Sequence, residues 1–184
     1  MARALVPLAP GFEEIEAVTI VDVLRRAGVT VDVAGTVPGP ITGSHGITLT
    51  PDRTLAGVAA DDYDLVALPG GMPGSTNLRD DPDVLRLLRE AAARGRATTA
   101  ICAAPIVLAA AGLTAGRTVT SHPSVARLLA GSEYREAIVV EDGPVVTSRG
   151  AGTAMEFALT LVTRLAGAET AERLRAQMVV PSVR

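Results

Sequence analysis

Residues 98–111 read TTAICAAPIVLAAA, and this stretch decides the fold. Thr98–Ile101 is predicted to be a strand, and Pro105–Ala111 is typical of a helix that begins at a proline. Cys102 lies between the two, followed by two small residues that leave room for a crowded backbone. The stretch therefore predicts a sharp strand-to-helix turn with a thiol at its centre.

The same alternation of strand and helix patterns continues along the chain. Further strands are predicted at Ala4–Leu8, Val29–Ala34, Leu65–Leu68 and Val119-Thr120. Two hairpins are predicted, at 41–50 around His45-Gly46 and at 138–147 around Asp142-Gly143. Helices are predicted at Glu13–Ala27, at 81–94, after His122-Pro123, in a segment that ends at Leu165, and near the C-terminus. Strands that alternate with helices favour a mostly parallel sheet covered on both faces. We therefore expect an α/β fold, a three-layer sandwich of flavodoxin-like type, in a single domain over residues 1–184.

Three helices carry clear end signals. The helix at Glu13–Ala27 has acidic residues in its first turn and Arg25-Arg26 in its last, and Gly28 follows as a stop. Asp81-Pro82 is typical of a helix start. Thr153-x-x-Glu156 has the spacing of a capping box, which predicts that the Thr153 hydroxyl caps the helix that ends near Leu165.

Composition excludes several classes of protein. Apolar residues make up 48% of 184 residues, the net charge is −3, and there is no Trp. No block of Lys and Arg is present, so we expect no nucleic-acid partner. The apolar run at the N-terminus is broken by Pro7 and Pro10 and is too short for a signal segment or a membrane span. A single cysteine cannot form an internal disulfide, which fits a reducing, cytoplasmic location.

Three features follow predicted strands, where ligands bind in such sheets: Pro69-Gly70-Gly71, Cys102 and His122. At a helix N-terminus the Cys102 thiol would have a lowered pKa and would act as a nucleophile. The alternative is that Cys102 is a small buried apolar residue. Gly70 and Gly71 would let backbone N–H groups form an oxyanion hole, whereas the alternative is an ordinary glycine-rich turn.

Glu16 is the acid that needs an explanation. Stepping back four residues from Ile20 on the apolar stripe of the first helix leads to Glu16, which places a carboxyl on the buried face. Burial is costly unless the carboxyl is protonated or paired, and a protonated Glu16 could donate a hydrogen bond to a thiolate. The alternative is a solvated Glu16 at a splayed helix start. Glu13 and Glu14 are explained as partners of the helix dipole.

The chain has two histidines, so any Cys–His mechanism must use His45 or His122. His122 follows a strand and is the better candidate for a general base. His45 lies in a hairpin turn, where it is either solvated or a residue over the pocket. No cluster of Cys and His has the spacing of a metal site, and no glycine-rich phosphate loop is present. We therefore expect no metal and no cofactor.

Six motifs, in this order and at this spacing, resemble the ThiJ/PfpI superfamily, most closely its branch of parkinsonism-associated deglycases. The motifs are GFEEIE at 11–16, DVLRRAG at 22–28, LPGG at 68–71, AICAAP at 100–105, TSHP at 120–123 and TSRG at 147–150. The resemblance implies a class I glutamine amidotransferase-like fold, a homodimer through the first helix, and a peroxide-sensitive Cys102. It also implies that Glu16 is protonated beside that thiol, that the N–H groups of Gly71 and Ala103 surround the oxyanion, and that His122 lies near.

Departures from the superfamily narrow the expected activity. Ala103 stands where the protease-like branch has a histidine, so a peptidase is not expected, and no DNA-binding module is appended. His45 stands where the branch usually has an arginine beside the pocket, which changes its anion contacts. The resemblance implies detoxification of small reactive carbonyls, as a glutathione-independent glyoxalase or a deglycase, by thiolate attack. A redox sensor or chaperone-like protein, and a specialised cysteine hydrolase or hydratase, remain alternatives.

Overall fold

The computed structural model describes residues 1–181 and has a seven-stranded sheet in the order β10-β11-β7-β6-β1-β2-β5. The strands are β1 Arg3–Leu8, β2 Thr30–Gly35, β5 Arg53–Thr54, β6 Leu65–Leu68, β7 Ala97–Ile101, β10 Val139–Asp142 and β11 Val145–Ser148. All neighbouring pairs are parallel except β10 with β11. The predicted mostly parallel α/β sheet is confirmed. The predicted single domain, 1–184, extends to three residues outside the described range, and its extent stays a prediction.

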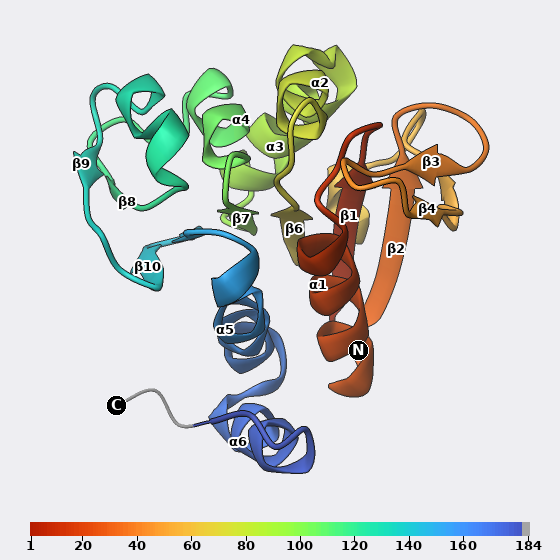
Figure 1. The fold of residues 1–184 in the computed structure, drawn as a ribbon, viewed down its shortest axis with the longest axis vertical. Helices are drawn as coiled ribbons and strands as arrows, with labels where there is room; N and C mark the ends of the chain where they lie inside the picture. The colour runs from red at the N-terminus through yellow and green to blue at the C-terminus, as the bar shows by residue number, and fades with distance from the viewer. Residues whose placement is uncertain (182–184) are drawn as a thin grey trace.

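Helices cover both faces of this sheet (Figure 1). The helices are α1 Glu14–Arg26, α2 Gly74–Asp80, α3 Pro82–Ala93, α4 Pro105–Ala110, α5 Ala154–Ala166 and α6 Ala168–Gln177, with 3₁₀ turns η1 Ala60–Asp62, η2 Pro123–Leu128 and η3 Ala151–Thr153. One buried cluster joins α2, α3 and α4 to the sheet, and a second joins α1, α5 and α6 to the other face. The molecule therefore has the three layers that the sequence predicts.

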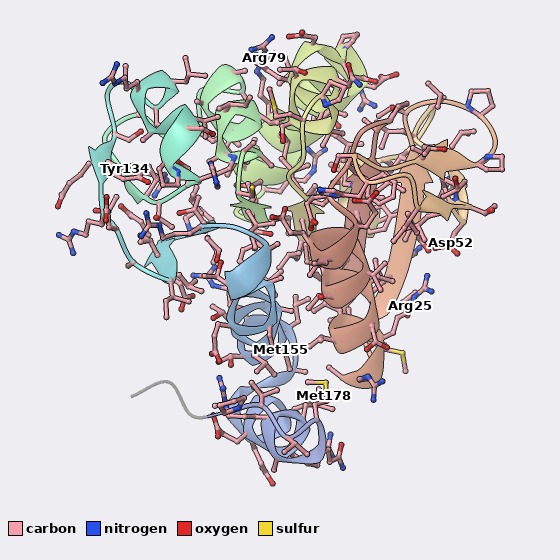
Figure 2. All side chains as sticks on the ribbon, viewed as in Figure 1. Arg25, Asp52, Arg79, Tyr134, Met155 and Met178 are labelled. Carbon is pink, nitrogen blue, oxygen red and sulfur yellow. The ribbon has the colours of Figure 1, made fainter. Side chains whose placement is uncertain are left out.

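The layers form because each helix presents one apolar stripe to the strands. On α1 the buried stripe consists of Ile20, Val23 and Leu24 after an acidic first turn. Met155 of α5 and Met178, just beyond α6, pack against the edge of the same cluster (Figure 2). The anchored stripe fixes the rotation of α1 and with it the direction of each side chain in the first turn.

Short elements account for most of the differences from the sequence expectations. The hairpins are confirmed as β3 Ile41–Thr42 with β4 Thr48–Leu49 and as β10 with β11, and β8 Thr118–Val119 pairs with β9 Glu133–Tyr134. The helix α2 was not predicted, because Pro73-Gly74 is typical of a loop. The strand β5 was not predicted either, since two residues are too few to show a period.

The predicted capping box at Thr153 is wrong. The Thr153 hydroxyl accepts hydrogen bonds from the backbone N–H groups of Arg149 and Gly150 and donates to the Gly150 carbonyl, so it does not cap α5. Its predicted partner Glu156 instead pairs with Arg175 of α6. Asp81, in contrast, caps α3 as expected, because its side chain accepts from the N–H groups of Asp83 and Val84.

The carboxyl ends of four central strands lie side by side in the order β11-β7-β6-β1. Each is followed by a turn: Gly150 after β11, Cys102 after β7, Gly70-Gly71 after β6, and the approach to α1 after β1. This edge therefore gathers residues from across the chain. Among residues 1–181, no helix combines the length and the apolar character that crossing a membrane requires.

Candidate active site

Cys102 occupies a strained turn between β7 and α4. Its φ of 64° lies in the left-handed region, which costs a residue other than glycine about 1–2 kcal/mol. The turn is held on both sides, because the Cys102 N–H donates to the Ser148 carbonyl over 3.0 Å and its carbonyl accepts from the His122 N–H over 2.7 Å. The predicted sharp turn is confirmed, and neighbouring backbone compensates for its strain.

Two backbone N–H groups, from Gly71 and Ala103, donate to the Cys102 side chain. Gly71 reaches this position with a φ of 91°, and a Cβ there would overlap the backbone of Glu13. Glycine is therefore required at position 71. Gly70 has a different role from the predicted one, because its N–H donates to Glu16 Oε2 over 2.7 Å and is not available to an oxyanion. A Cβ on Gly70 would also lie 2.6 Å from the Cβ of Cys102.

Glu16 is fully buried, as its place on the apolar stripe of α1 predicts. Within residues 1–181 its Oε1 atom has no hydrogen-bond partner, and the Cys102 thiol is the side chain that interacts with the carboxyl. Burial raises the pKa of Glu16 from 4.5 to about 7, against the opposing hydrogen bonds from Gly70 and Cys102. The carboxyl therefore gains or loses its proton near neutral pH.

The predicted lowering of the Cys102 pKa is wrong. Burial, together with the negative charge of Glu16 and the hydrogen bond to it, raises the pKa of this thiol from 9.0 to about 12, while the N–H groups of Gly71 and Ala103 lower it. The helix α4 has only six residues and begins three positions after Cys102, so its dipole is a weak influence. Between these two pKa values the pair holds one proton and one negative charge.

A cavity of about 460 Å³ opens beside this pair. Cys102, Glu16, His45 and His122 all line it, so the structure brings these predicted residues together. The His122 ring is exposed, and its Nδ1 lies 2.7 Å from the hydroxyl of Ser124. Among the described residues no hydrogen bond joins the ring of His122 to Cys102. As placed, His122 is a neighbour of the thiol and not its hydrogen-bonded base.

Sequence reasoning missed the role of Glu14. Its carboxylate is 4% exposed and accepts hydrogen bonds from the backbone N–H groups of His45, over 2.6 Å, and Ile47, over 3.3 Å. The His45 Nδ1 lies 2.9 Å from the same carboxylate. Burial acts to raise the pKa of Glu14, but these hydrogen bonds outweigh it and lower the pKa to about 2. No local signal could have found this, since the partners lie some thirty residues away.

Glu13, Glu14 and His45 bring ligand atoms within 4.8 Å of one another, a grouping that spacing along the sequence did not indicate. Both oxygens of Glu14 already accept hydrogen bonds from the 44–47 loop, and Glu13 Oε2 accepts from the Glu16 N–H over 2.7 Å. The donor set is therefore that of a helix cap and an ion pair, and we assign no metal to it.

Comparison with known proteins agrees with this geometry. A model of the DJ-1/PfpI family matches residues 2–164. The chain is 45% identical over 183 residues to the Parkinson disease protein 7 homolog of Danio rerio, with 97% of each chain covered. It is 39% identical over 174 residues to a Caenorhabditis elegans protein named glutathione-independent glyoxalase DJR-1.2, with 93% of this chain and 92% of that protein covered.

Solved structures give the same result. Drosophila melanogaster DJ-1beta superposes with a TM-score of 0.95 at 43% identity, over 98% of this chain and 99% of that one. An oxidized DJ-1 of Toxoplasma gondii superposes with a TM-score of 0.95 at 36% identity, over 99% of this chain and 100% of that one. On sequence, fold and the arrangement around Cys102, the chain belongs to the DJ-1/PfpI family.

Proposed function

We propose that this protein converts small reactive carbonyl compounds through Cys102, as a glutathione-independent glyoxalase or a deglycase. The observation that carries the proposal is the pair of the partly exposed Cys102 and the buried Glu16, with two N–H donors to the sulfur. A relative named glutathione-independent glyoxalase supports the glyoxalase reaction. The cavity of about 460 Å³ is large enough for a three-carbon substrate.

The reaction follows from the proton shared by the pair. The ionised Glu16 carboxylate takes the thiol proton, and the thiolate of Cys102 attacks the aldehyde carbon of methylglyoxal to form a hemithioacetal. The N–H groups of Gly71 and Ala103 stabilise the developing oxyanion. Glu16, or a water that it holds, moves a proton from the first carbon to the second, and water hydrolyses the resulting thioester to lactate. The thiolate leaves unchanged, so no oxidant and no cofactor is needed.

The test is lactate formation from methylglyoxal by the purified protein without glutathione. We expect turnover by the wild type and only background for Cys102→Ala. The substitution His122→Gln is the comparison, because the His122 ring has no hydrogen bond to Cys102. It should lower lactate formation less than a substitution of Glu16 does. A wild type that forms no lactate, and releases no adduct from glyoxal-modified amines, would refute the proposal.

A redox-sensing role is the second candidate. The described structure leaves Cys102 partly exposed at the cavity, and the chain has no second cysteine to resolve an oxidised sulfur as a disulfide. Oxidation would then stop at oxygen adducts held by the same N–H groups. Peroxide-dependent binding of a partner by a protein that has no carbonyl turnover would favour this role.

We also propose a homodimer in the cytoplasm. Ile15 and Val18 on the outer face of α1 are 58% and 46% exposed, and a second cavity of about 290 Å³ lies between α1, the strands β1 and β2, and the segment 49–52. The salt bridge of Arg25 and Asp52 lies at its rim, in view in Figure 2. Apolar surface with mixed charge at the edge suits a two-fold interface. Light scattering that gives the mass of one chain at micromolar concentration would refute the dimer.

A further inference from the structure

The loop of residues 43–47 forms one wall of the Cys102 cavity, and Glu14 holds it there. The Glu14 carboxylate binds the loop through the N–H groups of His45 and Ile47. Gly43 makes room for this contact, because a Cβ at that position would overlap the Glu14 carboxyl. A buried carboxylate on α1 therefore fixes the position of His45 and Ile47, and both line the cavity.

The ring of His45 is directed by the same carboxylate. A carboxylate can only accept, so the Nδ1 atom at 2.9 Å from Glu14 Oε2 carries a proton. Glu13 Oε1 lies 3.9 Å from the same nitrogen. Protonation at Nε2 then switches the ring between neutral and cationic forms. The Glu14 carboxylate raises the pKa of His45 above its ordinary 6.5, which moves this switch toward neutral pH.

Three acids and a second histidine share the cavity lining with this ring. The cavity lining has the acids Glu13, Glu14 and Glu16 on the side of α1, and Cys102 and His122 across from them. Within the described part of the chain the lining contains no Lys and no Arg. The Ser124 N–H donates to Nδ1 of His122, and no carboxylate is bonded to that ring. Of the two histidines that line the cavity, His45 is therefore the one whose cationic form is stabilised by a carboxylate partner.

We propose that the Glu14–His45 pair sets the charge at the mouth of the cavity and so selects between anionic and neutral electrophiles that approach Cys102. With His45 cationic, the pair is neutral and admits carbonyl compounds that carry a carboxylate, such as 2-oxo acids. With His45 neutral, the charge of Glu14 is uncompensated and favours uncharged dicarbonyls. The inference rests on the proposed function, since it specifies the charge of the substrate that Cys102 attacks.

Two alkylating probes test the pair without any turnover. Iodoacetate is an anion and iodoacetamide is neutral, and both react with the same thiolate of Cys102. The ratio of their rate constants therefore cancels the thiolate fraction and reports the local charge. We expect the ratio of iodoacetate to iodoacetamide to fall by roughly 3- to 10-fold as pH rises through the titration of His45, and the fall to shrink in high salt.

Matched variants identify which group causes the fall in the ratio of the two alkylation rate constants. His45→Gln should shrink the fall to the part that Glu16 contributes, whereas His122→Gln, which replaces the other histidine of the chain, should keep the full fall. Glu16 titrates in the same pH range, and because its effect remains in His45→Gln, the difference from the wild type isolates His45. Glu14→Gln should move the fall to lower pH, because the ring loses its charged partner.

Gly43→Ala tests the positioning of the loop with Glu14 and His45 both present. The new methyl group would displace the Glu14 carboxyl, so the fall should move to lower pH as in Glu14→Gln. Gly152→Ala is the matched control, since a Cβ there meets nothing within 4 Å and its φ is not left-handed. It should behave as the wild type does.

A fall in the ratio that is as large in His45→Gln as in the wild type, or that keeps its midpoint in Glu14→Gln, would overturn the inference. The outcome is separable from that of the proposed function, because alkylation requires only a reactive thiol. A protein that shows the fall but forms no lactate would refute the proposed function alone. A protein that forms lactate with a flat ratio would refute the charge selection alone.

Discussion

Glu14 and Glu16 lie two residues apart in the first turn of α1, and their carboxyl groups behave in opposite ways. Both are buried, at 4% and 0% exposed, and for both burial is the largest influence on the pKa. The pKa of Glu14 is nevertheless lowered to about 2, while that of Glu16 is raised to about 7. Depth in the protein therefore does not decide the charge of either group.

The number of donors around each carboxyl makes the difference. Glu14 accepts from two N–H groups of the 43–47 loop and from the His45 ring. Glu16 accepts from one N–H group, that of Gly70, and interacts with the Cys102 thiol, while within residues 1–181 its Oε1 atom has no hydrogen-bond partner. Several donors hold Glu14 as a permanent anion with a structural task. A single donor leaves Glu16 able to exchange a proton, which is the property that proton transfer requires.

The largest expected effect is on the pH dependence of stability through Glu16. In the folded protein the pKa of Glu16 lies above the ordinary value of 4.5. Its contribution to the free energy of unfolding is therefore complete below pH 4.5 and is lost as pH rises toward about 7. The difference between the folded and the ordinary pKa of Glu16 corresponds to about 3 kcal/mol of stability. Glu16→Gln should therefore gain about that much on the wild type between pH 4 and pH 8, measured by urea unfolding. Glu169→Gln, at an exposed site, is the control, and an equal gain there would contradict the interpretation.

Glu14 should give the opposite sign. Its folded pKa lies below 4.5, so its contribution is present above pH 4.5 and is lost as pH falls toward about 2. Screening by solvent at the cavity reduces the stability that corresponds to this pKa difference to about 2 kcal/mol. Glu14→Gln should cost that amount at pH 7 and progressively less in acid, as read from denaturant midpoints. A cost that is equal at pH 3 and pH 7 would show that Glu14 acts by shape and not by charge.

Two substitutions at Glu16 separate proton transfer from packing. Glu16→Gln keeps a polar contact to Gly70 but cannot take the thiol proton, and Glu16→Leu loses both, so lactate formation should fall roughly 10-fold or more, with Leu below Gln. The rise of wild-type turnover through pH 7 should disappear in both. Intact-mass spectrometry after graded peroxide should also show oxidation of Cys102 to a different extent. A Leu variant that matches the wild type in all three would exclude Glu16 from the site.

The smallest expected effect is at the far end of α1. Asp22 and Arg26 form an ion pair one turn apart, with both side chains about half exposed. Such pairs contribute about 0.3–0.5 kcal/mol. Asp22→Asn should lower stability by no more than that and leave the alkylation ratio at Cys102 unchanged. A loss above about 1 kcal/mol that depends on protein concentration would instead place this ion pair inside the proposed dimer interface.

Features set by local periodicity could be predicted from the sequence. The apolar stripe of α1 indicated that Glu16 is buried, and the strand–cysteine–helix pattern indicated the turn at Cys102 before either contact was known. The family motifs indicated Gly71 and Ala103 as donors. Each of these depends on the order of neighbouring residues or on their spacing within one element.

Features that depend on distant contacts could not be predicted. The donors that keep Glu14 ionised come from a loop some thirty residues away. The sequence placed Glu16 beside Cys102 as a protonated donor, but it did not indicate that burial and the Glu16 charge raise the Cys102 pKa. The Thr153 hydroxyl likewise had two possible sets of partners, and only the turn at Arg149 and Gly150 decides between them. Local pattern fixes where a side chain points, whereas the groups it meets follow from the tertiary fold.

The first turn of α1 uses consecutive residues for separate tasks: Glu13 caps the helix, Glu14 holds the loop, Ile15 lines the cavity mouth, and Glu16 faces the thiol. A helix advances by about 100° per residue, so one inserted or deleted residue would rotate every one of these side chains away from its partner. The stripe from Ile20 onward fixes the rotation of α1, so a change in length between this first turn and Ile20 would displace all four side chains in one mutational event.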